Sequence, residues 1–218
     1  MNYPPNGHVE PGGATISRTV TLPDGLEVEV RKLSVGPMDN NCYVLVNEGQ
    51  ALMIDAANEA DHILTEVEGL VICTVMTTHG HQDHWQALDD VAEATGADVV
   101  FHADDASMMP RAADRHVSDG DTIPVGGAYV RLIHTPGHTP GSTCILLGDK
   151  DLFTGDTLFP GGFGRTTRPE EFAQICRSGT EKLFDVLGDD VHVYPGHGDD
   201  TTIGAERPHL QEWRERGW

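Results

Sequence analysis

Basic residues are scarce in this chain of 218 residues, which carries 14 Lys and Arg against 35 Asp and Glu, a formal net charge of −21. Nucleic-acid binding depends on contacts between Lys or Arg and phosphate groups. We therefore expect no nucleic-acid partner and no polyanionic substrate. A surface this acidic favours solubility in a crowded or salty cytosol, and bound cations would offset part of the charge.

Cysteine is also rare, and the four thiols lie far apart with no C-x-x-C pair: Cys42, Cys73, Cys144 and Cys176. The last three lie within apolar runs, which favours small buried thiols in a reducing compartment over disulfides or metal ligands. No stretch approaches the roughly 20 apolar residues that span a bilayer. The first residues lack the basic start and apolar run of a signal peptide. We expect a cytoplasmic protein without membrane contact.

Length and composition fit one domain. Residues 1–14 are rich in Pro and Gly without a periodic pattern and are expected to form a flexible N-terminal arm, followed by a single domain over 15–218. Strands and helices alternate, which predicts the α/β class. We expect a β-meander over 26–55, strands over 71–76, 98–101, 122–125, 129–134, 142–147, 151–154 and 191–194, and helices over 58–68, 85–95, 169–178, 181–187 and 203–216.

Histidine, by contrast, is abundant, with twelve residues. The segment His79-x-His81-x-Asp83-His84 places four ligand-type side chains in six residues, directly after the apolar run 71–76. Open α/β sheets place their sites at the carboxyl ends of such strands. Alternate residues of an extended turn point the same way, so His79 and His81 can converge on one cation. Asp83 and His84 can then reach a second cation.

Three later segments have a related form, because each ends a strand with a glycine beside a ligand-type residue. They are Pro136-Gly137-His138, Thr154-Gly155-Asp156 and Pro195-Gly196-His197. Glycine lets the backbone turn sharply and keeps a side chain away from the metal. Neutral imidazoles suit zinc or iron, and a carboxylate can span two cations about 3.5 Å apart.

This pattern resembles the metallo-β-lactamase superfamily, and most of all its glyoxalase II (hydroxyacylglutathione hydrolase) branch. The resemblance is carried by T-H-G-H-Q-D-H at 78–84 with the three later ligands, and it covers about 41–206. It implies a four-layer αβ/βα sandwich, with two sheets face to face and helices outside.

The resemblance also implies a site for two divalent metal ions, zinc in the first place and iron or manganese as alternatives. A metal-bound hydroxide would attack a carbonyl carbon, since the metal lowers the pKa of bound water toward roughly 7. Asp83 would orient the hydroxide and accept its proton, which makes it the catalytic residue. The implied ligands are His79, His81 and His138 for one ion, Asp83, His84 and His197 for the other, and Asp156 as the bridge.

The expected reaction is hydrolysis of an ester-like bond, first of all in a small acyl thioester, because thiolates leave readily as anions. Asp156 stands where secreted metallo-β-lactamases often carry Cys. Phe159 stands where lactonase relatives often have Tyr. Both departures disfavour lactams and acyl-homoserine lactones. Glyoxalase II has a basic C-terminal helical region that binds glutathione, but only 21 residues follow His197, so another low-molecular-weight thiol carrier is as plausible.

A function of another class stays open: an iron-dependent persulfide dioxygenase, whose motif in this superfamily is nearly the same. One iron held by His79, His138 and Asp156 would then activate oxygen. A scaffold protein without catalytic activity is disfavoured, because all seven ligand positions are filled.

Several residues are weaker candidates. Asp55 is similar to the acid that supports metal ligands in this family, or it is a plain turn former. The glycine-rich segment from Phe159 to Arg165 forms a wall of the substrate cleft or a flexible connection. Arg165 and Arg168 are candidates for contacting an anionic substrate group.

Two other histidines and the tryptophans near the C-terminus are still weaker candidates for the functional site. We expect His134 to be a structural residue and His102 to be a minor candidate for the cleft edge. Trp213 and Trp218 are assigned to packing or to a homodimer contact.

Overall fold

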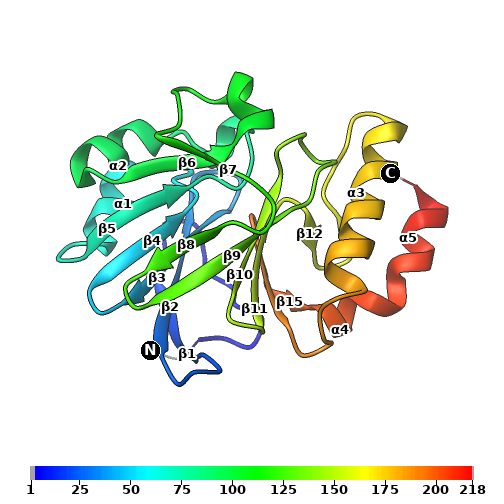
Figure 1. Ribbon diagram of the computed structural model, residues 1–218, viewed down its shortest axis with the longest axis horizontal. Coiled ribbons are helices and arrows are strands. Elements are labelled where there is room, and N and C mark those ends of the chain that lie inside the picture. Colours follow the sequence, from blue (N-terminus) through cyan, green and yellow to red (C-terminus); the bar gives the residue numbers. More distant parts are fainter. Residues whose placement is uncertain (1–2, 218) are drawn as a thin grey trace.

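Two β-sheets face each other in the computed structural model, which describes residues 3–217, and helices cover their outer sides (Figure 1). The first sheet has seven strands in chain order: β1 (Ile16–Thr21), β2 (Glu27–Val35), β3 (Asn40–Asn47), β4 (Gln50–Ile54), β5 (Val71–Met76), β6 (Asp98–His102) and β7 (Arg115–Val117). The second sheet has the order β15 (Thr201–Thr202), β14 (His192–Pro195), β11 (Asp151–Gly155), β10 (Thr143–Leu147), β9 (Ala128–His134) and β8 (Thr122–Val125). Strands β12 (Leu158–Phe159) and β13 (Gly162–Phe163) form a separate pair.

Helices α1 (Ala60–Glu66) and α2 (Leu88–Thr95) cover the first sheet, and α3 (Pro169–Gly179), α4 (Ile203–Glu206) and α5 (Leu210–Arg216) cover the second (Figure 1). Three apolar cores join these layers: one between the sheets, one beneath α1 and α2, and one beneath α3 and α5. The predicted four-layer αβ/βα sandwich is confirmed. No helix within 3–217 has the length and apolar character needed to cross a membrane.

Strand β2 illustrates how the residue pattern separates the layers. Successive side chains of a strand point to opposite faces. Val28 and Val30 join the core between the sheets, whereas Leu33 and Val35 join the core beneath the helices. Lys32 has the parity of the inner residues and is fully buried.

The first sheet changes from antiparallel to parallel pairing at β4. Strands β2, β3 and β4 form the predicted meander, whereas β4, β5 and β6 run parallel and are linked through α1 and α2. Because parallel strands end at the same edge of a sheet, the segments after Ile54 and Met76 emerge side by side. Asp55 and the histidine-rich loop therefore become neighbours.

Helix boundaries differ from the predicted ones where tight turns intervene. Helix α2 begins at Leu88 rather than at 85, because Gln82–His84 forms a 3-10 turn, η1. The helix predicted over 203–216 is divided into α4, the 3-10 turn η4 (Arg207–His209) and α5. Pro208 lies in η4, and its missing N–H cannot continue an α-helix. A π-helical turn, η3 (Thr180–Phe184), replaces the predicted helix over 181–187.

Residues 3–14, expected to form a flexible arm, lie against the loop that follows β14. The Tyr3 hydroxyl donates to Asp200 at 2.5 Å, and the Asn6 side chain donates to Asp199 at 2.9 Å. Val9 is buried. Asp200, the hydrogen-bond partner of Tyr3, is 197 positions away in the chain. No local pattern in the sequence could therefore have predicted this packing.

All four cysteines are free thiols, and three of them are buried, among them Cys144 and Cys176 as predicted. The prediction of a buried thiol was wrong for Cys73, which is only half-buried. The run that contains it begins at the exposed Val71 and becomes continuously buried only from Thr74 onward.

Candidate metal centre

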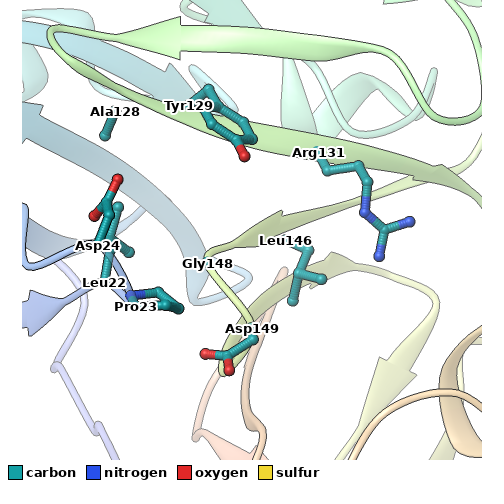
Figure 2. A pocket seen from close by; sticks show the side chains of 9 residues that line it. All are labelled: Leu22, Pro23, Asp24, Ala128, Tyr129, Arg131, Leu146, Gly148 and Asp149. Atoms are coloured by element: carbon teal, nitrogen blue, oxygen red, sulfur yellow. The ribbon is translucent and has the colours of Figure 1, made fainter.

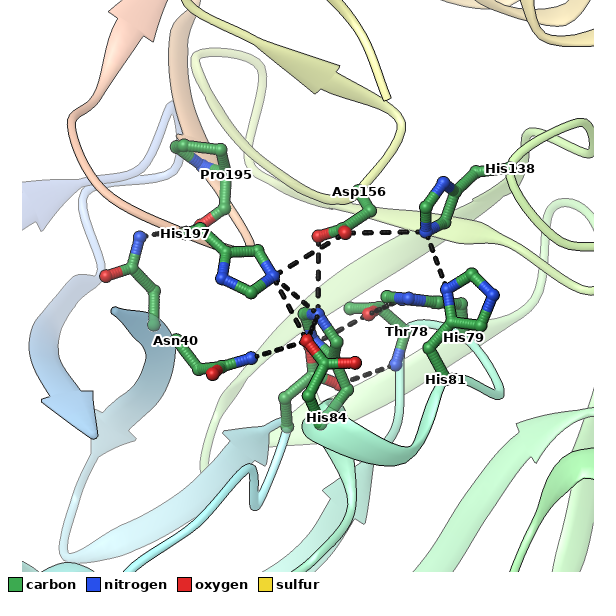
Figure 3. A network of polar contacts seen from close by, with 12 residues as sticks. Asn40, Thr78, His79, His81, His84, His138, Asp156, Pro195 and His197 are labelled. Carbon is green, nitrogen blue, oxygen red and sulfur yellow. Dashed lines mark hydrogen bonds and ion pairs between the residues drawn. The ribbon is translucent and has the colours of Figure 1, made fainter. Parts of the chain in front are cut away.

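Seven histidine and aspartate side chains meet where loops from both sheets converge (Figure 3). The loop after β5 and the turn η1 belong to the first sheet, and the loops after β9, β11 and β14 belong to the second. All seven predicted ligands are brought together: His79, His81, Asp83, His84, His138, Asp156 and His197.

One group of possible ligands consists of His79, His81 and His138, each offering a ring nitrogen within 4.8 Å of the others. His81 Nδ1 and His138 Nε2 lie 2.8 Å apart. The ring of His79 is nearly perpendicular to that of His81, with centroids 4.9 Å apart. Three imidazoles thus converge on one point, and one of them comes from the opposite sheet.

The second group consists of Asp83, His84 and His197, again within 4.8 Å of one another. His84 Nε2 lies 3.1 Å from His197 Nε2, and Asp83 Oδ2 lies 3.3 Å from His197 Nε2. The first two residues come from η1 and the third from the loop after β14. This group therefore also combines ligands from both sheets.

Asp156 lies between the two groups. Its Oδ1 is 3.3 Å from His84 Nε2, and its Oδ2 is 3.4 Å from His138 Nε2 and 3.6 Å from His197 Nε2. One carboxylate therefore faces nitrogen atoms of both groups. This is the position that the sequence resemblance implies for a bridging ligand.

The donor set fits metal ions. His79 Nε2 and Asp156 Oδ1 are buried without a hydrogen-bond partner, although buried polar atoms are almost always paired. Nitrogen atoms of different imidazoles face each other at 2.8 and 3.1 Å. Ligands of one tetrahedral ion, with bonds of about 2.0–2.1 Å, have a similar spacing. We conclude that this cluster binds metal through imidazole nitrogen and carboxylate oxygen.

Charges within the cluster shift its pKa values in opposite directions. Burial lowers the pKa of His79 well below its usual value, and the neighbouring His84 lowers it further. Burial also acts to lower the pKa of His197, but the carboxylates of Asp156 and Asp83 outweigh it and raise that pKa to about 10. Burial acts to raise the pKa of Asp156, but His84 and His197 hold it well below the usual range. Asp156 is thus ionised at neutral pH.

Asp55 lies directly behind the ligands, at 1% exposure. Its carboxylate accepts hydrogen bonds from the Thr78 N–H at 2.7 Å and the Thr78 hydroxyl at 2.8 Å, and it lies 2.9 Å from His84 Nδ1. A carboxylate on Nδ1 leaves Nε2 of that imidazole free to bind metal. Asp55 also has a φ of 57°, a left-handed conformation that costs energy in a residue other than glycine.

Asn40 was missed by the sequence reasoning. Its side-chain N–H donates to Asp83 Oδ2 at 2.9 Å (Figure 3), and its backbone forms an isolated bridge with His197. Next to it, the Asn41 amide donates to the carbonyl of Pro195 at 2.9 Å. The start of β3 therefore fixes both the acid of η1 and the loop that carries His197. Its partners lie far along the chain, so no local sequence pattern indicated this role.

A hollow of about 330 Å³ adjoins the centre and is lined by ligands, by the glycine-rich loop and by Arg216 of α5. The Phe159 and His197 ring centroids lie 6.2 Å apart. The carbonyl of Arg165 lies 2.7 Å from His138 Nδ1. Within residues 3–217, neither Arg165 nor Arg216 forms an ion pair with a carboxylate. The predicted loop therefore borders the metal centre, and Arg165 of this loop and Arg216 of α5 place two cations beside it.

The other weak candidates lie elsewhere. Arg168 forms an ion pair with Glu171 at 2.6 Å, at the start of α3. The rings of His102 and His134 stack at 3.9 Å. Trp213 is buried in the core beneath α3 and α5, as expected of a packing residue, and Trp218 lies outside the described residues.

A second hollow, of about 300 Å³, lies between the β8–β9 hairpin, the β1–β2 turn and the β10–β11 turn (Figure 2). Tyr129, Arg131 and Leu146 contribute to its lining. It contains none of the seven ligands, and no histidine or cysteine lines it. It therefore offers no group for the chemistry considered above.

Comparisons of sequence agree with this centre. Residues 35–198 match the family model described as the metallo-beta-lactamase superfamily. An uncharacterized protein of Aquifex aeolicus is 33% identical over 82% of this chain and 93% of that protein. A Bacillus subtilis protein named as a probable metallo-hydrolase is 30% identical over 81% and 93%. A hydroxyacylglutathione hydrolase of Haemophilus influenzae is 29% identical over 83% and 95%.

Solved structures agree with the fold. The structure described as ETHE1 from Myxococcus xanthus has a TM-score of 0.75 and 34% identity, covering 83% of this chain and 82% of that one. The B3 metallo-beta-lactamase BLEG-1 has a TM-score of 0.75 and 27% identity over 89% and 98%. A third protein, solved in a di-iron-bound form, has a TM-score of 0.69 and 26% identity over 81% and 96%.

Proposed function

The chain belongs to the metallo-β-lactamase superfamily, and we propose that within it this protein is a metal-dependent hydrolase of small acyl thioesters. The observation that carries the proposal is the completeness of the centre, in which Asp156 touches nitrogen atoms of both ligand groups. We infer two divalent ions, zinc in the first place and iron or manganese as alternatives. The hydroxyacylglutathione hydrolase of Haemophilus influenzae supports a thioester as substrate.

When bound, the ions would supply a water of lowered pKa and a Lewis acid for the carbonyl oxygen. The protein's own contribution centres on Asp83. Its pKa is lowered, because hydrogen bonding by His197 and the charge of His84 outweigh the effect of burial, so it is ionised at neutral pH and can accept a hydrogen bond from the attacking water. Asn40 holds the carboxylate in place at 2.9 Å. We assign Asp83 the role of orienting the attacking water and accepting its proton.

The hollow beside the centre supports a substrate with an apolar part and an anionic part. Phe159 and Phe163 supply apolar surface, and Arg165 and Arg216 supply positive charge in an otherwise acidic protein. Its volume of about 330 Å³ suits a small molecule. Free thiols throughout the chain suit a reducing compartment, and we place the enzyme in the cytoplasm.

The proposal is tested with metal-loaded protein and a panel of substrates. Acyl thioesters should be hydrolysed fastest, followed by aryl esters, with nitrocefin, lactones and a short RNA near background. Lactoylglutathione and acyl esters of other small thiols belong in the same panel, to identify the thiol. Thioester hydrolysis no faster than in metal-free protein would refute the assignment.

A second candidate is the iron-dependent persulfide dioxygenase. His138 Nε2 lies 3.4 Å from Asp156 Oδ2, and the rings of His79 and His138 are 4.7 Å apart, so the three residues that would hold a single iron lie together here. Elemental analysis giving one iron per chain, with glutathione persulfide consumed in step with oxygen, would favour it over hydrolysis.

A further inference from the structure

We infer that Asp105 is a positioning residue that fixes the spacing between the loop carrying His79 and His81 and the loop carrying His138. Asp105 lies in the 3-10 turn η2 (Ala103–Met108), directly after β6, and is 1% exposed. It is not one of the seven ligands. The inference rests on the proposed metal-dependent function, because its consequence is a difference in metal affinity.

The carboxylate of Asp105 joins the two loops through three hydrogen bonds. Oδ2 accepts from the Gly80 N–H at 2.8 Å and from the Thr139 hydroxyl at 2.6 Å. Oδ1 accepts from the Gly141 N–H at 2.7 Å. Gly80 separates His79 from His81, and Thr139 directly follows His138, so two of the three bonds end beside a ligand and the third ends in the same turn as His138.

Two of these bonds cross the boundary between the two sheets, because Asp105 follows β6 of the first sheet. Gly80 follows β5 of the first sheet, whereas Thr139 and Gly141 lie between β9 and β10 of the second. Within the second loop, the Thr139 and Ser142 hydroxyls lie 2.8 Å apart, and the Thr139 N–H donates to Ser142 Oγ at 3.0 Å. Asp105 therefore holds a turn that is already rigid, so moving this carboxylate would move the whole turn.

Asp105 also accounts for Gly141, a glycine that the ligand pattern leaves unexplained, and it lies close to Gly80. A Cβ on Gly141 would lie 2.6 Å from Asp105 Cγ, and a Cβ on Gly80 would lie 3.1 Å from Asp105 Cβ and 2.7 Å from Met108 Cβ. Real Cβ atoms essentially never come within 3.0 Å of such atoms, and a contact at 3.0–3.4 Å is unusually tight. Asp105 therefore requires glycine at position 141, whereas at position 80 Met108 gives the closest contact and Asp105 adds to the crowding.

The distance between the two loops matters because metal coordination tolerates only small errors in the positions of its ligands. His81 Nδ1 and His138 Nε2 are 2.8 Å apart, and both must come within about 2.0–2.1 Å of the same ion. All three groups that face Asp105 are hydrogen-bond donors, so its carboxylate is needed as an acceptor at both oxygens. Asparagine has the same shape but would turn an amino group toward one of these donors. One bond would be replaced by a repulsive contact, and the loops would separate.

The test is the affinity of Asp105→Asn for zinc and cobalt, measured by competition with a chelator. Outer hydrogen-bond partners typically change metal affinity 10- to 100-fold, and we expect a loss of at least about 10-fold at the site of His79, His81 and His138. The cobalt-loaded variant should also have an altered visible spectrum.

The matched control is Asp151→Asn. Asp151 is also buried, at 2% exposure, and accepts from the Tyr194 hydroxyl at 2.6 Å, but it begins β11 at the end away from Asp156. This variant should lose stability while keeping wild-type metal affinity and cobalt spectrum. Wild-type affinity in Asp105→Asn, with a fall in melting temperature like that of the control, would show that Asp105 is only structural.

Two milder variants keep the inference testable should Asp105→Asn fold poorly. Thr139→Val removes one donor and should weaken metal binding several-fold, whereas Thr139→Ser keeps the hydroxyl and should restore it. Equal affinities for the two variants would overturn the inference. Because these measurements need no substrate, a protein that binds metal as described but does not hydrolyse thioesters would refute the proposed function alone.

Discussion

Among single residues, Asp83 has the most specific proposed role, because we assign it both metal binding and proton transfer. Its carboxylate is fixed by Asn40 at 2.9 Å and lies 3.3 Å from His197 Nε2. The first ligand group does not include it. A change at the Asp83 carboxylate can therefore slow the reaction without removing the ion that the first ligand group would hold.

Replacing Asp83 by Asn should slow hydrolysis by at least about 100-fold, the scale for losing a positioned base. The ion held by His79, His81 and His138 should remain, so metal analysis of the purified variant should find most of that ion. Asp156→Ala is the contrasting variant and should lose metal and activity together, since Asp156 touches both groups. Wild-type hydrolysis by Asp83→Asn at unchanged metal content would remove Asp83 from the mechanism.

The four thiols should differ in reactivity at neutral pH. Burial raises the pKa of Cys42 to about 12 and that of Cys144 to about 11, so both keep their protons, and only thiolates react with disulfide reagents. A thiol reagent should modify Cys73 in the native protein and all four cysteines in denaturant. Rapid modification of Cys42 under native conditions would show that the core beneath α1 opens.

Among the elements, the ligand loops were predictable, and of the residues that support them only Asp55 was a candidate from the sequence. Each ligand loop ends a strand and has glycine beside the ligand, a signal contained in a few consecutive residues. Asn40 and Asp105 act on atoms 43 and 25 positions away in the chain. Only the pairing of strands brings these atoms together, so no local pattern could indicate them. The interruption at Pro208 was a local signal, and the continuous helix predicted over it ignored the missing N–H.

Trp213 is the buried aromatic residue of helix α5 and packs against β13 and η3. Trp213 is 3% exposed, and its ring centroid lies 5.4 Å from that of Phe163 and 6.3 Å from that of Phe184. Phe163 and Arg216 line the hollow beside the metal centre. The packing of α5 therefore shapes the proposed substrate site.

Trp213→Ala should lower the free energy of unfolding by about 3–5 kcal/mol, the usual cost of removing a buried Trp. It should also raise KM more than it lowers kcat, because the hollow loosens while the ligands stay in place. Denaturant unfolding and steady-state kinetics measure the two effects. Val186→Ala is the control, since Val186 is 65% exposed and exposed substitutions change stability by only about 0.5 kcal/mol.

For the molecule as a whole, a buried ion pair joins the first sheet to the loop that carries His197. Lys32 Nζ donates to Asp200 Oδ1 at 2.8 Å and to the carbonyl of Gly198 at 2.7 Å. Both side chains are almost completely buried. Asp200 also accepts from the Tyr3 hydroxyl at 2.5 Å, so the N-terminal segment belongs to the same network. No local pattern indicated this ion pair, because a lysine in an alternating strand looks like a surface residue.

Lys32→Met should destabilise the protein by about 3–5 kcal/mol, because it leaves the Asp200 carboxylate buried without its cation. The double variant Lys32→Met/Asp200→Asn removes that uncompensated charge and should recover part of the loss. Denaturant unfolding of the wild type, both single variants and the double variant gives the coupling between the two residues. Strict additivity of the two single effects would contradict an energetic link.

Each ligand group takes members from both sheets, and this has a consequence for when the protein can acquire its metal. His84 and His197 are 113 positions apart, and a ribosome adding about 5–20 residues per second needs roughly 6–23 s to cover that distance. During this interval the chain already contains His79, His81, Asp83 and His84, whereas His138 and Asp156 are added within it and His197 only at its end. The second ligand group therefore stays incomplete until His197 has been made. Both ligand groups, and with them the proposed two-ion site, are complete only after translation has passed His197.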